Sequence, residues 1–275
     1  MSTATLEAPP ATPAPAGHRS RPFAWVPQSL TLAWRNIIRI RQNPEALADV
    51  TFQPIIFLVL FLFVFGGAIS TGGRWQDYLP FLLPGLLVQT VVFSTMGTGV
   101  ALNDDFAKGV FDRFRSLPIA RISPLVGAVL GDAVRYMISI VILMGTGFAL
   151  GFRFENGVGN GLLACLVVLV FALALCWIWV WLGLKLRTAQ SVQGVAFLVM
   201  FPLTFGSNVF VNPDTMPGFL KAFGKVNPVN YLVDTMRGLM LGGDVQKPLL
   251  ITLASMVGLV AIFAPLAIRA YRRRT

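Results

Sequence analysis

The chain has 275 residues, of which 55% are hydrophobic and only 12% are charged. A soluble domain usually carries about 25% charged residues, so this composition all but excludes a soluble fold. The formal net charge of +10 therefore favours basic loops on the cytoplasmic face of a membrane over a nucleic-acid-binding surface.

The first residues differ in composition from the rest of the chain. They are rich in Ala, Pro and Thr and offer little from which a core could form. Residues 1–28 are therefore predicted to be a disordered cytoplasmic tail. Residues 29–275 are predicted to form a single transmembrane domain.

An amphipathic helix is predicted directly after this tail, over residues 29–43. Apolar side chains fall on one face at helical spacing, and Arg side chains fall on the other. The residues that mark the two faces are Trp34 and Ile38 against Arg35 and Arg39. A helix of this kind lies in the membrane interface, where it also braces the spans that follow.

Six largely uncharged runs follow, each long enough for a helix to cross a hydrocarbon core of about 30 Å, which takes about 20 residues. They lie at 50–73, 78–102, 122–152, 156–184, 188–213 and 248–268. Each span must satisfy its own backbone hydrogen bonds in lipid, so helices are expected. The predicted fold class is all-α, an integral membrane protein with six transmembrane helices.

The basic residues orient these six spans. Most of the 22 Lys and Arg residues fall on the side that holds both termini. Because cytoplasmic loops carry the excess of Lys and Arg, both termini are predicted to be cytoplasmic. The preference for Arg over Lys and the many Ala residues are typical of a GC-rich bacterial host, so the predicted location is the bacterial plasma membrane.

The cytoplasmic loop 103–121 carries an apolar stripe outside the bilayer. The stripe residues share one helix face and are Phe106, Val110, Phe114 and Leu117. Charges of both signs surround them, at Asp104, Asp105, Asp112, Arg113 and Arg115. Exposed aromatic residues rimmed by charge favour a docking surface for another protein. The alternative is an ordinary solvated loop.

The outer segment 212–247 is longer than most helix connections and must have structure of its own. Its turns are marked by Pro213 and Pro217 and by Asn227 before Pro228. Asn227 is placed to cap a helix that has Pro228 in its first turn. The segment therefore predicts short re-entrant helices before the last span, at the outer wall of a pathway.

Several kinds of chemistry are missing from the sequence. It contains no GxxxxGK[ST] run, so it has no phosphate-binding loop of its own. It has one His, and its two Cys residues lie in an apolar run and read as small buried hydrophobic residues. No catalytic residue, metal or cofactor is therefore predicted in this chain. The energy for any active process would have to come from a partner subunit.

One charged pair lies inside a predicted span, Asp132 with Arg135 three residues on. Charged residues at membrane depth are costly and often functional. The alternative is a structural ion pair near the interface. A proton relay normally uses more than one acid, so a proton-coupled carrier is poorly supported.

Two loop sequences resemble one transporter family. FAKGVFDRFRSLPIAR at 106–121 resembles the cytoplasmic coupling segment of type-two ABC exporter permeases, closest to the daunorubicin-resistance branch. FVNPDTMPGFLKAFGKVNPVNYLVDTMRGLM at 210–240 resembles the outer segment of the same branch, although Asn212 stands where proline is more usual. The resemblance runs from about residue 29 to residue 274.

The resemblance implies a half-transporter. Two permease copies, identical or related, would assemble with two copies of a separate ATP-binding subunit, which would bind ATP and Mg. The implied coupling residues are Phe106, Lys108, Gly109, Val110, Asp112, Arg113, Phe114, Leu117 and Pro118. The implied residues of the outer segment are Pro213, Pro217, Asn227, Pro228, Tyr231, Asp234 and Arg237.

The resemblance further implies export of an amphipathic, antibiotic-like substrate from the cytoplasm or the inner leaflet. Candidate pathway aromatics for a flat cationic substrate are Phe93, Phe197, Phe201 and Phe205. For each of them the alternative is a ring that faces lipid or packs between helices. Two other functions stay open: a lipid or polysaccharide exporter of the same type, and a stand-alone channel or membrane enzyme.

Overall fold

The computed structural model describes residues 31, 44–69, 74–111, 123–211 and 216–274. All regular elements within these residues are helical. They are α2 (Pro44–Leu60), the π-helix η1 (Phe61–Phe65), α3 (Gly66–Ile69), α4 (Trp75–Ser94), α5 (Met96–Ala107), α7 (Ser123–Ala149), α8 (Val158–Lys185), α9 (Ala189–Phe205), α10 (Gly218–Gly224), α11 (Pro228–Leu241) and α12 (Gln246–Arg274). The predicted all-α class is therefore confirmed for the described residues, whereas the predicted interface helix and tail lie outside them, apart from residue 31.

Four helical stretches of the described chain are long and apolar enough to cross a membrane. They are Trp75–Ala107, Ser123–Ala149, Val158–Lys185 and Gln246–Arg273. They correspond to the second, third, fourth and sixth predicted spans. Shorter apolar helices, Thr51–Phe65 and Ala189–Phe205, stand at the places of the first and fifth.

The fifth predicted run, 188–213, is helical only in part. Thr188 caps the start of α9 by accepting a hydrogen bond from the backbone N–H of Ser191. The helix ends at Phe205, and residues 206–211 form turns. Backbone groups of Asn208 and Val209 bond to side chains of α11 instead of continuing the helix, which an apolar run alone could not predict.

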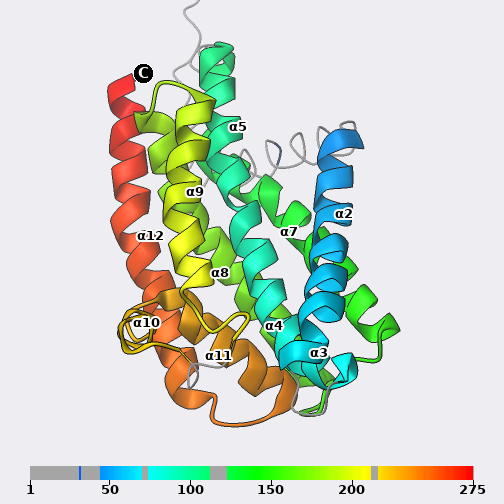
Figure 1. Ribbon diagram of the computed structural model, residues 1–275. Helices are drawn as coiled ribbons and strands as arrows, with labels where there is room; N and C mark the ends of the chain where they lie inside the picture. Colours follow the sequence, from blue (N-terminus) through cyan, green and yellow to red (C-terminus); the bar gives the residue numbers. More distant parts are fainter. Residues whose placement is uncertain (1–30, 32–43, 70–73, 112–122, 212–215, 275) are drawn as a thin grey trace, which may run out of the picture.

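The helical passes alternate in direction (Figure 1). The C-terminal ends of α5, α8 and α12 lie at one end of the bundle, while α10 and α11 lie at the other. Helix α12 packs along α8, and α5 packs against α8 and α9. Helix α2 contacts α7 and α4, and α11 contacts α4, α8 and α12. The short helices therefore close one end of the bundle.

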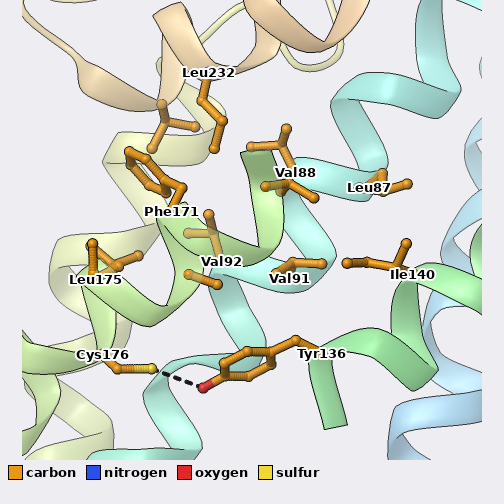
Figure 2. Packing of buried hydrophobic residues seen from close by; sticks show 14 of the residues in the cluster. Leu87, Val88, Val91, Val92, Tyr136, Ile140, Phe171, Leu175, Cys176 and Leu232 are labelled. Atoms are coloured by element: carbon orange, nitrogen blue, oxygen red, sulfur yellow. Dashed lines mark hydrogen bonds between the residues drawn. The ribbon is translucent and has the colours of Figure 1, made fainter. Parts of the chain in front are cut away.

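The core of the bundle is built around α4 and the facing side of α8. Figure 2 shows Val88 and Val92 of α4 on the side of Phe171 of α8, and Leu87 and Val91 on the side of Ile140 of α7. The four α4 side chains and Phe171 have an exposed fraction of 0%. The packing of these side chains fixes α4 and α8 relative to each other, and the polar side chains described below are positioned on this pair of helices.

Glycines let α5 and α8 approach each other at backbone contact. A Cβ atom added to Gly183 would lie 2.5 Å from the carbonyl oxygen of Gly99. A Cβ atom on Gly99 would lie 2.6 Å from the carbonyl oxygen of Trp179. Small residues at such crossings are the usual means of tight helix packing in membranes.

Substitution Gly183→Ala should lower the stability of the bundle by about 2 kcal/mol. The added methyl group would clash with the backbone of α5, which cannot move aside by a change of side-chain rotamer. Thermal unfolding in detergent would measure the loss. The matched control is Gly258→Ala in α12, where an added Cβ has no atom within 4 Å. Equal melting temperatures for the two variants would contradict the close approach.

Candidate functional site

The predicted coupling loop at 103–121 begins within the last residues of α5, which ends at Ala107. The backbone N–H of Lys108 donates to the carbonyl oxygen of Asp104 at 2.9 Å, and that of Gly109 donates to Phe106 at 3.1 Å. Gly109 has a φ of 68°, a left-handed conformation that favours glycine and terminates helices. The stripe that helical spacing predicts is therefore interrupted at Gly109.

An aromatic cluster of three rings fastens the start of this loop to the last helix. Phe106 and Phe111 stack with centroids 3.9 Å apart and planes at 7°. Tyr271 of α12 packs edge-on against both rings, at 5.9 and 5.8 Å. Phe111 and Tyr271 are both 4% exposed. Neither was singled out from the sequence, because residues 160 apart reveal no contact in one chain.

Only some of the remaining predicted coupling residues lie within the part of the chain that the structure describes. Lys108 is exposed and Val110 is half-buried, so both reach the surface beside the aromatic cluster. The other predicted coupling residues lie outside the described residues, and these are Asp112, Arg113, Phe114, Leu117 and Pro118. The coupling role of the loop stays a prediction.

The intramembrane pair predicted at Asp132 and Arg135 forms, with 3.5 Å between Arg135 Nη2 and Asp132 Oδ1. The same Nη2 donates a 2.7 Å hydrogen bond to the carbonyl oxygen of Ser94, at the end of α4. Gly97 leaves room for the guanidinium, since an added Cβ would lie 2.8 Å from Arg135 Nη1. The pair therefore ties α7 to the junction of α4 and α5.

The Asp132 carboxylate is also the end of a polar chain that reaches α8. It accepts a short hydrogen bond from Thr98 Oγ1 of α5. Thr98 Oγ1 lies 2.9 Å from Tyr136 Oη, and Tyr136 Oη lies 3.0 Å from Cys176 Sγ (Figure 2). A single carboxylate with one hydrogen bond and one ion pair, at the end of a polar chain that joins α5, α7 and α8, fits a structural fastening better than a proton relay.

A second polar cluster lies at the opposite end of the bundle. Arg237 of α11 donates from Nη2 to the carbonyl oxygens of Asn208 and Val209, at 2.8 and 3.0 Å. Its Nε donates to the carbonyl oxygen of Phe81 at 3.2 Å, and its guanidinium lies 3.6 Å from the Phe81 ring centroid. Asp234, its predicted helix neighbour, instead accepts from Asn208 Nδ2.

Burial lowers the pKa of Arg237 to about 10, although the charges of Asp234 and Tyr78 oppose this. The guanidinium therefore stays charged at neutral pH. Burial raises the pKa of Asp234, and the Asn208 hydrogen bond opposes this shift. The hydrogen bonds of both side chains hold the turn at 206–211 against α4 and α11.

The predicted cap of the outer helix is confirmed. Asn227 Oδ1 accepts a 3.0 Å hydrogen bond from the backbone N–H of Val229, and Pro228 stands in the first turn of α11. Asn227 Nδ2 also donates to the carbonyl oxygen of Leu203 at 2.6 Å, and Tyr231 donates to Lys225 at 2.8 Å.

The two remaining prolines of the outer segment are at its start. Pro217 stands directly before α10 as its N-cap residue. Pro213 lies outside the described residues. The part of the outer segment that the structure describes is therefore two short helices, α10 and α11, anchored to the end of α9.

Substitution Arg237→Lys should destabilise the protein by about 3 kcal/mol, because a single ammonium cannot replace a forked donor to three buried carbonyl groups. Unfolding followed by circular dichroism in detergent would measure this. Arg153 gives a matched control, since it also donates to two backbone carbonyls, at 3.0 and 2.7 Å, but is exposed. A loss as small as that of Arg153→Lys would contradict the anchoring role.

The four candidate pathway aromatics lie along one side of α9. Phe93 of α4 meets Phe197 edge-on at 6.1 Å, and Phe201 stacks on Phe205 at 4.3 Å. The exposed fractions of Phe197, Phe201 and Phe205 are 44%, 55% and 41%. Exposed rings of this kind are open to a ligand, a lipid or another protein.

The row of rings continues onto the first apolar helix. Phe210 stacks with Phe205 at 5.3 Å and with Phe61 of η1 at 4.4 Å. Phe61 also stacks with Phe57 and Phe65. The sequence did not point to Phe61 or Phe210, which become neighbours only because the turn at 206–211 brings them together.

Known proteins match this chain along most of its length. A family model described as ABC-2 type transporter matches residues 27–241. A daunorubicin resistance ABC transporter permease protein of Streptomyces coeruleorubidus is 38% identical over 94% of this chain and 91% of its own. A probable doxorubicin resistance ABC transporter permease protein of Mycobacterium tuberculosis is 26% identical over 94% of this chain and 92% of its own length. A putative transport permease of Cyanophora paradoxa is 25% identical over 78% of this chain and 74% of its own length.

Proposed function

Because the chain belongs to the ABC-2 type transporter family, we propose that it exports drug-like amphipathic molecules from the cytoplasm or the inner leaflet. The chain is a transmembrane permease subunit of an ABC transporter. The observation that carries the drug class is the 38% identity, over 94% of the chain, to a daunorubicin resistance permease.

The proposed topology has six spans with both termini in the cytoplasm of a bacterial cell. The alternating passes in Figure 1 support it, with α2, η1 and α3 as the first span and α9 as the fifth. Helices α10 and α11 then re-enter the outer leaflet. Their irregular connection at 206–211 is compatible with that depth, because protein covers it and side chains satisfy its backbone.

The proposed energy source is a separate ATP-binding subunit, which binds ATP and Mg in two copies. The full sequence has no phosphate-binding loop. The loop after α5 is the proposed docking element, and the ring cluster of Phe106, Phe111 and Tyr271 would pass its movement to α5 and α12. The proposed complex contains a second permease copy, identical or related.

Substitution Phe201→Ala should raise the anthracycline concentration for half-maximal stimulation of ATP hydrolysis about fivefold, since one aromatic contact with a cation contributes about 1 kcal/mol. The assay uses the complex of permease and ATP-binding subunit in nanodiscs. Leu198→Ala is the control, because Leu198 is 76% exposed on the same helix but carries no ring. Stimulation by lipid extracts and not by anthracycline would overturn the drug assignment in favour of a lipid exporter.

A further inference from the structure

A groove runs between α7, α8 and α12, helices that do not carry the row of exposed rings described above. Its volume is about 550 Å³. Its lining is apolar and includes Val129, Leu130, Ala174, Trp177, Met256 and Val257. It exists because α7 and α12 both pack on α8 and because the side chain of Ala174 between them is short.

The groove is open to the bilayer along its rim and closed at its floor. Val129, Ala174 and Met256 are buried, whereas Leu130 is 37% and Val257 is 69% exposed. All three helices belong to stretches long and apolar enough to span a membrane. The groove therefore faces hydrocarbon and can take an apolar chain from the side.

The groove lies in the cytoplasmic leaflet when the proposed topology is applied. At about 1.5 Å per residue, Trp177 lies about 6 Å and Val170 about 16 Å along α8 from Trp181, which lies near the cytoplasmic interface in the proposed topology. This depth runs from the acyl region to about the middle of a core about 30 Å thick. Trp181 and Phe263 pair at 5.8 Å between the groove and the helix ends, where aromatic side chains favour the membrane interface.

Two basic side chains at the cytoplasmic ends of α8 and α12 favour an anionic ligand in the groove. Lys185 ends α8 and Arg272 is in the last turns of α12, and both are exposed. At about 100° per residue, each lies about a quarter turn from the groove-lining face of its helix. Two positive charges attract a phosphate group and disfavour a cationic amphipath, so the ligand is not a cationic transport substrate.

We propose that this groove binds an acyl chain of an anionic phospholipid of the cytoplasmic leaflet, with the phosphate beside Lys185 and Arg272. The lipid fills the space between α7 and α12, two helices that both pack on α8. This inference rests on the proposed orientation of the helices in the membrane and not on the identity of the exported substrate.

Native mass spectrometry of the full chain, released from nanodiscs of equal phosphatidylglycerol and phosphatidylcholine, tests the proposal. Retained phosphatidylglycerol should exceed phosphatidylcholine in the wild type and fall to the phosphatidylcholine level in Ala174→Phe, which fills the floor. Leu166→Phe is the control, since Leu166 is 54% exposed on α8 and does not line the groove. Val257→Trp at the rim replaces Ala174→Phe if that variant does not fold.

A second arm tests the charge. Lys185→Gln and Arg272→Gln should each reduce retained phosphatidylglycerol about fivefold, because one basic residue contributes about 1 kcal/mol to binding of anionic lipid, and should leave phosphatidylcholine unchanged. Equal retention of both lipids by the wild type, or unchanged retention in the filled variants, would overturn the proposal. A change of oligomeric state in Ala174→Phe would also overturn it, since the groove would then be a protein interface.

Discussion

Replacing Arg135 with Leu should destabilise the protein by about 3 kcal/mol, the lower end of the range for breaking a buried ion pair, because the two side chains are 18% and 16% exposed. Asp132 would keep its hydrogen bond from Thr98 but lose its compensating charge. Ser94 would lose the donor that joins the end of α4 to α7. Thermal unfolding in detergent, followed by circular dichroism, measures the change.

A double substitution separates the charge from the packing. Asp132→Asn with Arg135→Gln removes both charges, keeps polar groups for Thr98 and Ser94, and should recover about half of the lost stability. Arg153→Leu is the control, because Arg153 is exposed. A loss below about 1 kcal/mol in Arg135→Leu, the range of a solvent-exposed pair, would contradict the fastening of α7 to the junction of α4 and α5.

Replacing Gly109 with Val should reduce binding of the ATP-binding subunit at least tenfold. A β-branched residue does not tolerate the φ of 68° found there, so the chain after α5 would leave in another direction. The docking element would then no longer continue from the cluster of Phe106, Phe111 and Tyr271. Co-purification of the two subunits, with detergent stability measured in parallel, gives the result.

The matched control for this substitution is Gly157→Val. Gly157 also has a positive φ, of 84°, with open space around it, but it precedes α8 at the other end of the bundle. It should suffer a similar backbone strain and bind the ATP-binding subunit normally. Undiminished binding in Gly109→Val, together with undiminished binding when Phe106 and Phe114 are both replaced by Asp, would remove the coupling role from this loop.

Local features of the fold could be predicted from the sequence. Hydrophobic length placed the four long helical stretches, and the pair of Asn227 and Pro228 marked the start of α11. The side-chain spacing of Asp132 and Arg135 predicted their contact, because residues three apart share a helix face. Each of these signals depends on residues that are close in the chain.

Contacts between distant residues could not be predicted in this way. Arg237 reaches Phe81, which is 156 residues away, and Tyr271 covers Phe106 and Phe111. The same kind of contact shortened α9, because α11 supplies side chains that bond the turn after Phe205. An apolar run indicates that a segment prefers lipid, and it does not indicate where tertiary hydrogen bonds replace the helix.

The most direct test of the permease assignment is ATP-driven transport by the reconstituted complex. The chain is co-expressed with the proposed ATP-binding subunit, and inside-out vesicles are given an anthracycline with ATP and Mg. We expect ATP-dependent drug accumulation that needs both subunits and is lost with Gly109→Val. Failure of the two chains to associate, or accumulation that proceeds without the ATPase, would contradict the account.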